Sequence, residues 1–486
     1  MSVVAHVESK EPVIEARRHE VSRMVPCRSM RDNTWRTAFA SSLVAALAGR
    51  ALIFLLLRIH WGWQPPYHSA YLHVPDWYEP ATHEYLVVHM PGYWAFLRLL
   101  QRVPLSLYIV APIAQTGLQL LAIASVARAV ADAVPSRFAH GRLALAAALG
   151  VDPWLCDTAI VMLPASVTAT IFLMLIERTI SACGQVLRER RPPSWMALVV
   201  ATGVLVGFGA YFRADFATYA VLPPLAVALV AWLSGAERPR RLAVLAPAAV
   251  LASLSLVIAL LVPHGLYLRM RSGSFVLTTY AGGSALWAGL GDGPNPWGVP
   301  DSDGSDELMQ AFGAAHGHRW LASAASSAFF AKLFFAHVRE QPSVFARIMI
   351  LRLHRTALGW PPTSVSFVGG YDMPPEIRRL GAELARGEPW YRLVLSGEHG
   401  PWMLKQFGLR YLGTALLWVL PIAALWFVTH PRTSTPLLLL PLLAYEAGIG
   451  VFVLTHWSYR YSQEFYWLGW LSVYLMTAAS ARADRD

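Results

Sequence analysis

Charged residues are scarce in this sequence. Asp, Glu, Lys and Arg make up only 14% of it, whereas hydrophobic residues make up 55%, with 19 Trp among them. A soluble globular domain carries about 25% charged residues. The shortage excludes an ordinary soluble protein and predicts a polytopic membrane protein.

Cysteine is also scarce, and sequence repeats are absent. The three cysteines, Cys27, Cys156 and Cys183, lie far apart and lack the spacing of metal ligands. This excludes a disulfide framework and gives no indication of a zinc site. No repeat of solenoid length is present, which argues against array architectures.

The positive charges, a formal net +10, are not gathered on one amphipathic face. They lie mostly in short segments between apolar runs, as membrane topology requires of cytoplasmic loops. Membrane topology therefore explains them better than a nucleic-acid partner does.

The apolar runs define the expected spans. Each is long enough, or nearly so, to cross about 30 Å of hydrocarbon, and together they predict about ten spans. The first follows a polar tail with five arginines and is longer than a signal-peptide core, so we expect it to remain uncleaved. The runs are 37–58, 104–130, 143–156 (short), 158–180, 195–212, 214–233, 242–263, 407–428, 435–455 and 461–479.

With the N-terminus in the cytoplasm, nearly all inside segments carry arginine, as the positive-inside rule asks. The predicted fold is an all-α polytopic membrane protein with a small mixed α/β extracytoplasmic domain, in the plasma (inner) membrane. The expected parts are a cytoplasmic tail (1–36), a transmembrane module (37–263) with outer loop 59–103, the extracytoplasmic domain (264–406), C-terminal transmembrane helices (407–479) and a second cytoplasmic tail (480–486).

A few ionisable residues lie within or beside apolar runs, where each needs a partner or a purpose. They are Arg50, Arg213, Asp215, Glu446 and Arg460. Arg213 and Asp215 could form an ion pair that fixes a helical hairpin, or they could serve a site. Arg460 could snorkel to the interface or bind a phosphate, whose oxygens match the guanidinium fork.

Acidic residues are concentrated in the first outer loop, in "VPDWYEPATHEYLVVHMPGY" (74–93). A carboxylate held by prolines and aromatic residues is a candidate general base, and the alternative is a solvated acidic loop. The candidates are Asp76, Glu79 and Glu84. His89, near the end of the loop, could bind substrate or cap a helix.

Five segments in this order resemble the GT-C membrane glycosyltransferases, particularly the family-39-like enzymes related to protein mannosyltransferases and aminoarabinose transferases. "HMPGY" is similar to a His/Arg-Pro-Pro-x-Tyr element, and "GVLVGFGAYFRADFATYAVLPPLAVAL" to a Gly-rich span that ends in a basic-Pro-acidic motif. "VPHGLYLRMRSGSFVLTTYAGGSALWAGLGD" resembles an Arg-x-x-x-Gly strand and the entry to the outer domain. "HVREQPSVFARIMILRLHR" resembles a helix returning to the membrane, and "SYRYSQEFYWLGWLSVYL" an Arg-Tyr motif.

The resemblance implies transfer of a sugar, with inversion, from a polyprenyl-phosphate donor to an acceptor at the outer face; the acceptor is a glycan, lipid or protein. It implies that a loop aspartate removes the acceptor's proton while basic groups stabilise the departing phosphate. Asp76 is the leading base, because it is the only Asp in the loop, and Glu79 and Glu84 are alternatives. The expected substrate-side residues are His89, Arg213, Asp215, Arg269, Arg271, Arg460 and Asp157.

The sequence departs from the family pattern at two places. Pro164 and Ala165 stand where many relatives carry a carboxylate, and Asp157 could substitute for it. Arg213-Ala214-Asp215 lacks the usual proline. No cofactor or metal is predicted, although a divalent metal remains an open alternative.

Two other functions remain open. A transporter or flippase would also have many spans with a few charges, although half-to-half similarity and paired broken spans are not evident in the sequence. A non-catalytic relative that binds polyprenyl phosphates is the second alternative.

Overall fold

The computed structural model describes residues 44, 46–51, 90–134, 141–160, 164–189, 193–299, 323–358, 400–431, 434–454 and 465–483. These residues are mostly helical, and no strand occurs among them. Five of the helices are long and apolar enough to cross a membrane, and three shorter apolar helices accompany them. The multi-pass membrane class is therefore supported, while the full set of ten spans remains a prediction.

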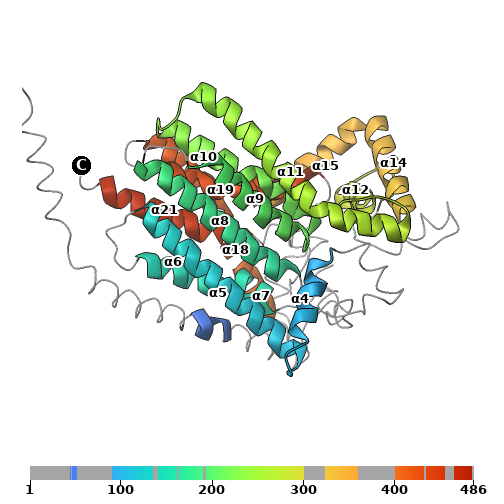
Figure 1. The fold of residues 1–486 in the computed structure, drawn as a ribbon, viewed down its shortest axis with the longest axis horizontal. Coiled ribbons are helices and arrows are strands. Elements are labelled where there is room, and N and C mark those ends of the chain that lie inside the picture. The colour runs from blue at the N-terminus through green and yellow to red at the C-terminus, as the bar shows by residue number, and fades with distance from the viewer. Residues whose placement is uncertain are drawn as a thin grey trace, which may run out of the picture.

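In the main bundle, helices that follow one another through short links run in opposite directions (Figure 1). Short links favour antiparallel neighbours, because the chain must turn back at once. Leu173, Leu175 and Ile176 of one central helix are fully buried in the core of this bundle. The helices are α5 (Leu107–Ala133), α8 (Pro164–Glu189), α9 (Trp195–Ala210), α10 (Leu222–Leu233) and α11 (Pro239–Ser272).

The bundle has two chemically different ends. At one, which we call the basic end, α8 and α10 finish and α9 and α11 begin, and the exposed side chains there include Arg238, Arg240 and Arg241. At the other, which we call the loop end, α5 and α8 begin and α9 and α11 finish. The positive-inside rule predicts that the basic end faces the cytoplasm, and this orientation remains a prediction.

The short span expected at 143–156 is broken into α6 (Gly141–Gly150) and α7 (Pro153–Ile160). The buried Asp152 ends the break, because its carboxylate accepts hydrogen bonds from the backbone of Trp154 (3.1 Å) and Leu155 (3.0 Å) and from the Trp470 indole (3.1 Å). Arg50 donates from Nε to the carbonyl of Gly150 at 3.0 Å. Two ionisable side chains thus satisfy the backbone groups that a break exposes.

Glycines allow α9 and α11 to approach closely. Gly203 and Gly207 lie one turn apart, and a Cβ built on each would come within 2.5 Å of Leu256 and Leu260 respectively. This is the small-xxx-small spacing by which membrane helices pack without the hydrophobic effect. The close contact fixes the position of α11 relative to the end of α9.

Replacing Gly203 with Val should separate α9 from α11 and lower the free energy of unfolding by about 1–3 kcal/mol. Gly117→Val on α5 is the matched control, because a Cβ there meets nothing within 4 Å. Thermal unfolding of both variants in detergent measures the difference. Equal loss in both variants would mean that helix propensity, rather than this contact, accounts for the effect.

A small helical cap lies beyond the end of α11 and contains α12 (Ala281–Gly289), η3 (Leu290–Asp292), α14 (Ala324–Glu340) and α15 (Pro342–Leu358). It has its own core of Trp287, Leu290, Val299, Phe330 and Phe334. The mixed α/β domain predicted over 264–406 is thus helical where the structure describes it. The strand that the Arg-x-x-x-Gly resemblance implied is instead the last turn of α11, which Gly273 ends at φ 77°, in the left-handed region that favours glycine.

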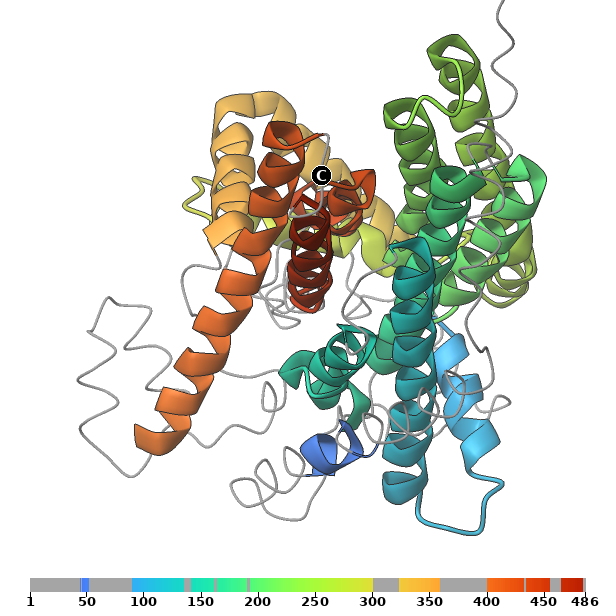
Figure 2. The ribbon, with the colours of Figure 1, turned by 90° about the vertical axis from the view of Figure 1, so that its left-hand side faces the viewer.

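The cap returns to the membrane helices through α15. This helix packs against α18 (Gly400–Thr429) and α19 (Leu440–Leu454). With α21 (Leu468–Ala483), these helices form the C-terminal part, which stands beside the α5–α11 bundle in Figure 2. Because the cap follows α11, which finishes at the loop end, the cap lies at that end of the bundle.

Candidate functional site

The structure describes only part of the predicted site. Arg213, Asp215 and Arg269 are described with their side chains. Arg271 lies in α11 and Asp157 in α7, but only their helical backbones are described. The remaining predicted residues lie outside the described residues: Asp76, Glu79, Glu84, His89 and Arg460.

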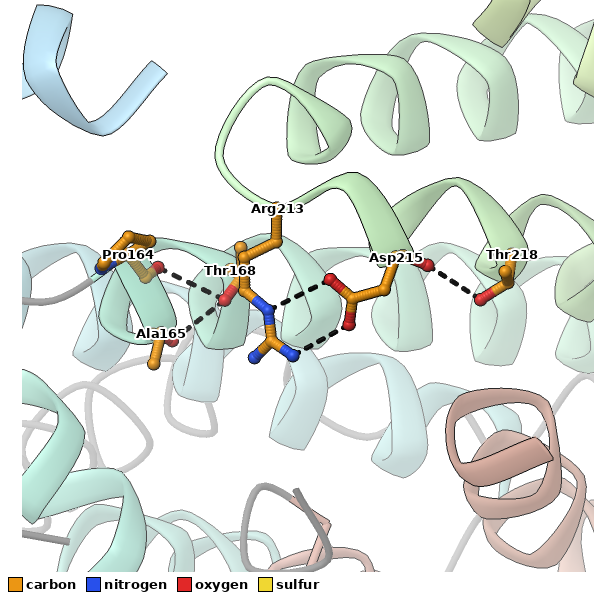
Figure 3. Close-up of polar contacts among 6 residues, drawn as sticks. All are labelled: Pro164, Ala165, Thr168, Arg213, Asp215 and Thr218. Carbon is orange, nitrogen blue, oxygen red and sulfur yellow. Dashed lines mark hydrogen bonds and ion pairs between the residues drawn. The ribbon is translucent and has the colours of Figure 1, made fainter. Parts of the chain in front are cut away.

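Arg213 and Asp215 form a two-point ion pair at the loop end (Figure 3). Nε of Arg213 donates to Oδ1 of Asp215 at 3.1 Å, and Nη2 donates to Oδ2 at 2.7 Å. The side chains are 17% and 23% exposed, so the pair is partly accessible. Arg213 has an extended backbone and directly precedes η2 (Ala214–Val221). The segment η2 turns the chain from α9 into α10. The ion pair that the sequence analysis considered is therefore present, and a role of these residues in a site remains a prediction.

The pair stands beside the start of α8. The rings of Phe172 on α8 and Tyr219 on η2 are 4.7 Å apart, which places these two elements side by side. Thr168, one turn before Phe172, donates to the carbonyls of Pro164 and Ala165 (Figure 3). The first turn of α8 has no acidic residue. The carboxylate described at this corner is therefore Asp215, from η2, and not a residue of α8.

Tyr211 connects this pair to the end of the acidic loop. Its carbonyl accepts a hydrogen bond from the backbone of Gly92 at 2.6 Å, at the start of α4 (Gly92–Leu100). Its hydroxyl donates to the carbonyl of Leu260 on α11 at 2.7 Å, and its ring lies 6.2 Å from that of His264. A residue two positions before Arg213 thus holds α4, α9 and α11 together.

Replacing Gly92 with Ala should disturb this junction, since the added Cβ would lie 2.6 Å from the carbonyl oxygen of Tyr211. We expect a loss of about 1–3 kcal/mol in stability, because backbone atoms must move. Gly282→Ala is the control: it also lies in the first turn of a nine-residue helix, but its Cβ meets nothing within 4 Å. Unfolding temperatures that match in the two variants would contradict the proposed role of Gly92.

A second buried connection runs from α4 through α5 to α7. The Tyr93 hydroxyl donates to Oε1 of Gln115 at 2.9 Å, and Nε2 of Gln115 donates to the carbonyl of Ala159 at 2.8 Å. Nε2 of Gln119 donates to the Thr158 hydroxyl at 3.1 Å. Buried polar groups in a membrane protein must be paired, so this network fixes the register of the three helices. The helix that carries Asp157 is thereby fixed relative to the end of the acidic loop.

Arg269 is exposed near the C-terminal end of α11. It follows Leu260 by nine residues, so it lies about 13 Å farther along the helix axis than the carbonyl that Tyr211 contacts. The structure places Arg269 at the loop end, and its role as a phosphate contact remains a prediction.

The residues described include no group of three or more His, Cys, Asp or Glu that could hold a metal ion. Tyr211, Gln115 and Gln119 were not predicted as site residues. The only sequence signal for them is a polar residue within an apolar run, because their partners include backbone carbonyls and distant side chains. Neither a protein-family model, nor a curated protein, nor a solved structure matches the chain.

Proposed function

We propose that the protein is an integral-membrane glycosyltransferase of the GT-C type, which moves a sugar from a polyprenyl-phosphate donor to an acceptor at the loop end of the bundle. One observation carries the proposal. The hydrogen bond from Gly92 to Tyr211 joins the end of the acidic loop to the segment that presents Arg213. The described end of the loop that carries the expected base is thus attached to the segment that carries the expected phosphate ligand.

The proposed chemistry is a single displacement. The acceptor oxygen attacks the anomeric carbon, the bond from that carbon to the phosphate oxygen breaks, and the acceptor proton passes to a loop carboxylate, with Asp76 as the leading residue. Arg213 contributes a fixed positive charge toward the departing polyprenyl phosphate. Partial burial strengthens that attraction relative to water.

A panel of polyprenyl-phosphate sugars, incubated with the purified protein and a crude membrane acceptor fraction, tests the proposal by mass spectrometry. We expect consumption of one donor and release of polyprenyl phosphate. A folded, monodisperse protein that consumes no donor across a broad panel would overturn the proposal. Binding of polyprenyl phosphate without turnover would instead indicate the non-catalytic relative.

Replacing Arg213 with Gln should lower turnover by about 10²–10³-fold, because a fixed charge near the leaving phosphate is lost. Asp215→Asn is the matched control: it breaks the same ion pair but leaves the arginine charge in place. We expect Asp215→Asn to retain much more turnover. If both variants lose turnover and stability equally, the pair serves only to fix the turn between α9 and α10.

A transporter is the second candidate, and one observation favours it. The break between α6 and α7 places the buried Arg50 and Asp152 within the bundle, and discontinuous helices form substrate and ion sites in many transporters. Solute uptake by proteoliposomes without any lipid-linked sugar would support this candidate. Such uptake, abolished by Asp152→Asn in a folded protein, would displace the glycosyltransferase proposal.

A further inference from the structure

The outer face of helix α15 exposes large aliphatic side chains. Val344, Ile348 and Arg352, spaced four residues apart, form its buried side. On the outside, Ile350 is 64% exposed and Leu353 is 51% exposed. A helix at the surface of a soluble domain places its charges outward and its aliphatic residues inward. In α15 an arginine lies inside, and two large aliphatic side chains, Ile350 and Leu353, lie outside.

The preceding helix, α14, continues this surface. Phe335 is 59% exposed, while Phe330 and Phe334 are buried in the cap. Lys332 and Arg339, three residues before and four residues after Phe335, are exposed on the same helical face. Basic residues beside exposed aromatic or aliphatic side chains are typical of helices that lie in a membrane interface.

The charge of the two helices favours an anionic surface. Residues 324–358 include five Lys or Arg and one acidic residue, Glu340. One of the five, Arg352, is neutralised inside by Asp292. Lys332, Arg339 and Arg347 are exposed, as is Glu340, so the described outer charges remain net positive.

The helix α15 packs against apolar helices that are candidates for membrane spans. The helix contacts α18 and α19, which are among the apolar helices suited to a membrane. α15 therefore belongs to a segment that packs against these apolar helices. A cap far from the bilayer would have no such contacts.

We propose that α14 and α15 lie in the lipid interface at the loop end, with Phe335, Ile350 and Leu353 among the upper acyl chains. Lys332, Arg339 and Arg347 then contact the phosphates of anionic lipids. Part of the segment that the sequence assigns to an extracytoplasmic domain thus rests in the membrane. The inference does not depend on the glycosyltransferase proposal.

Spin-label accessibility in the full-length protein tests this placement. Ile350→Cys, Leu353→Cys and Phe335→Cys are labelled in a Cys27→Ser background, because Cys156 and Cys183 are buried. The protein is reconstituted in nanodiscs of phosphatidylcholine and phosphatidylglycerol. Leu251→Cys, 65% exposed on α11, is the lipid control, and Arg240→Cys, exposed at the basic end, is the water control.

We expect the three labels to match Leu251→Cys, with a ratio of oxygen to nickel-complex accessibility about fivefold or more above that of Arg240→Cys. A ratio like that of Arg240→Cys would place the surface in water and overturn the proposal. Low accessibility to both reagents would show a protein partner, and would also overturn it. Using three label sites keeps the test valid if one variant fails to fold.

The role of charge is tested separately. Replacing Lys332, Arg339 and Arg347 together with Gln should lower the ratio at residue 350 in nanodiscs that contain phosphatidylglycerol, and change it little in phosphatidylcholine alone. An unchanged ratio in the anionic nanodiscs would overturn the contacts assigned to these three side chains.

Discussion

Replacing Arg352 with Met should lower the free energy of unfolding by about 3–5 kcal/mol, the usual cost of removing one partner of a buried ion pair. Arg352 and Asp292 have side chains that are 0% and 2% exposed, and Nε donates to Oδ2 at 2.8 Å. Nη2 also donates to the carbonyl of Gly289. The substitution leaves the Asp292 carboxylate and the Gly289 carbonyl buried with fewer hydrogen-bond donors. The expected loss of stability is therefore larger than the contribution of one hydrogen bond.

Two variants isolate the cause. Arg347→Met removes an exposed charge from the same helix, and its effect should stay within about 0.5 kcal/mol. Arg352→Met combined with Asp292→Leu removes both buried charges and should recover much of the loss. Thermal unfolding in detergent measures all three. An Arg352→Met midpoint equal to that of Arg347→Met would show that the pair does not secure α15 to η3.

The hydrophobic pattern predicted the long helices well, because about 30 Å of hydrocarbon demands a run of apolar residues whatever their packing. The span expected at 195–212 is α9, Trp195–Ala210, and that at 242–263 lies within α11. Boundaries were less predictable. The span expected at 158–180 is instead α8, at 164–189. Its start is shifted because Asp152 and Pro153 begin a separate short helix, α7, and Pro164 begins α8.

The ion pair between Arg213 and Asp215 could also be anticipated from the sequence, because an ionisable residue in an apolar run needs a partner. Arg213 and Asp215 are two residues apart and bind each other, so local spacing was enough. Tyr211 and Gln115 were missed for a physical reason. Each donates to a backbone carbonyl at least 44 residues away. Because every residue has a carbonyl, the sequence does not indicate which one accepts the hydrogen bond.

The Gly-rich segment after α11 was expected only as the entry to the outer domain. Its residues 281–289 form the helix α12. Gly283 explains part of this, because its missing Cβ lets α12 lie directly on the backbone of Ser327 in α14, whose hydroxyl accepts the Gly283 amide hydrogen at 3.2 Å. The glycine serves helix packing here rather than a turn.

Replacing Asp76 with Asn should lower turnover by about 10²–10⁴-fold, since an amide of nearly the same shape cannot accept the acceptor's proton. Donor binding should remain, because the basic groups that bind the phosphate are unchanged. Initial rates on the donor that the panel identifies, together with donor binding measured by itself, separate the two effects. Glu79→Gln and Glu84→Gln are the matched variants in the same loop.

The hydrogen bond between Gly92 and Tyr211 does not discriminate between Asp76 and Glu84 as the base. Glu84 and Asp76 precede Gly92 by eight and sixteen residues, and a chain spans at most about 3.3–3.6 Å per residue, so either can reach the Arg213–Asp215 pair. Turnover must therefore discriminate between them. Full loss in Asp76→Asn with near-normal turnover in Glu84→Gln assigns the base to Asp76, and the reverse assigns it to Glu84. Near-normal turnover in all three variants would remove the acids of this loop from the chemistry.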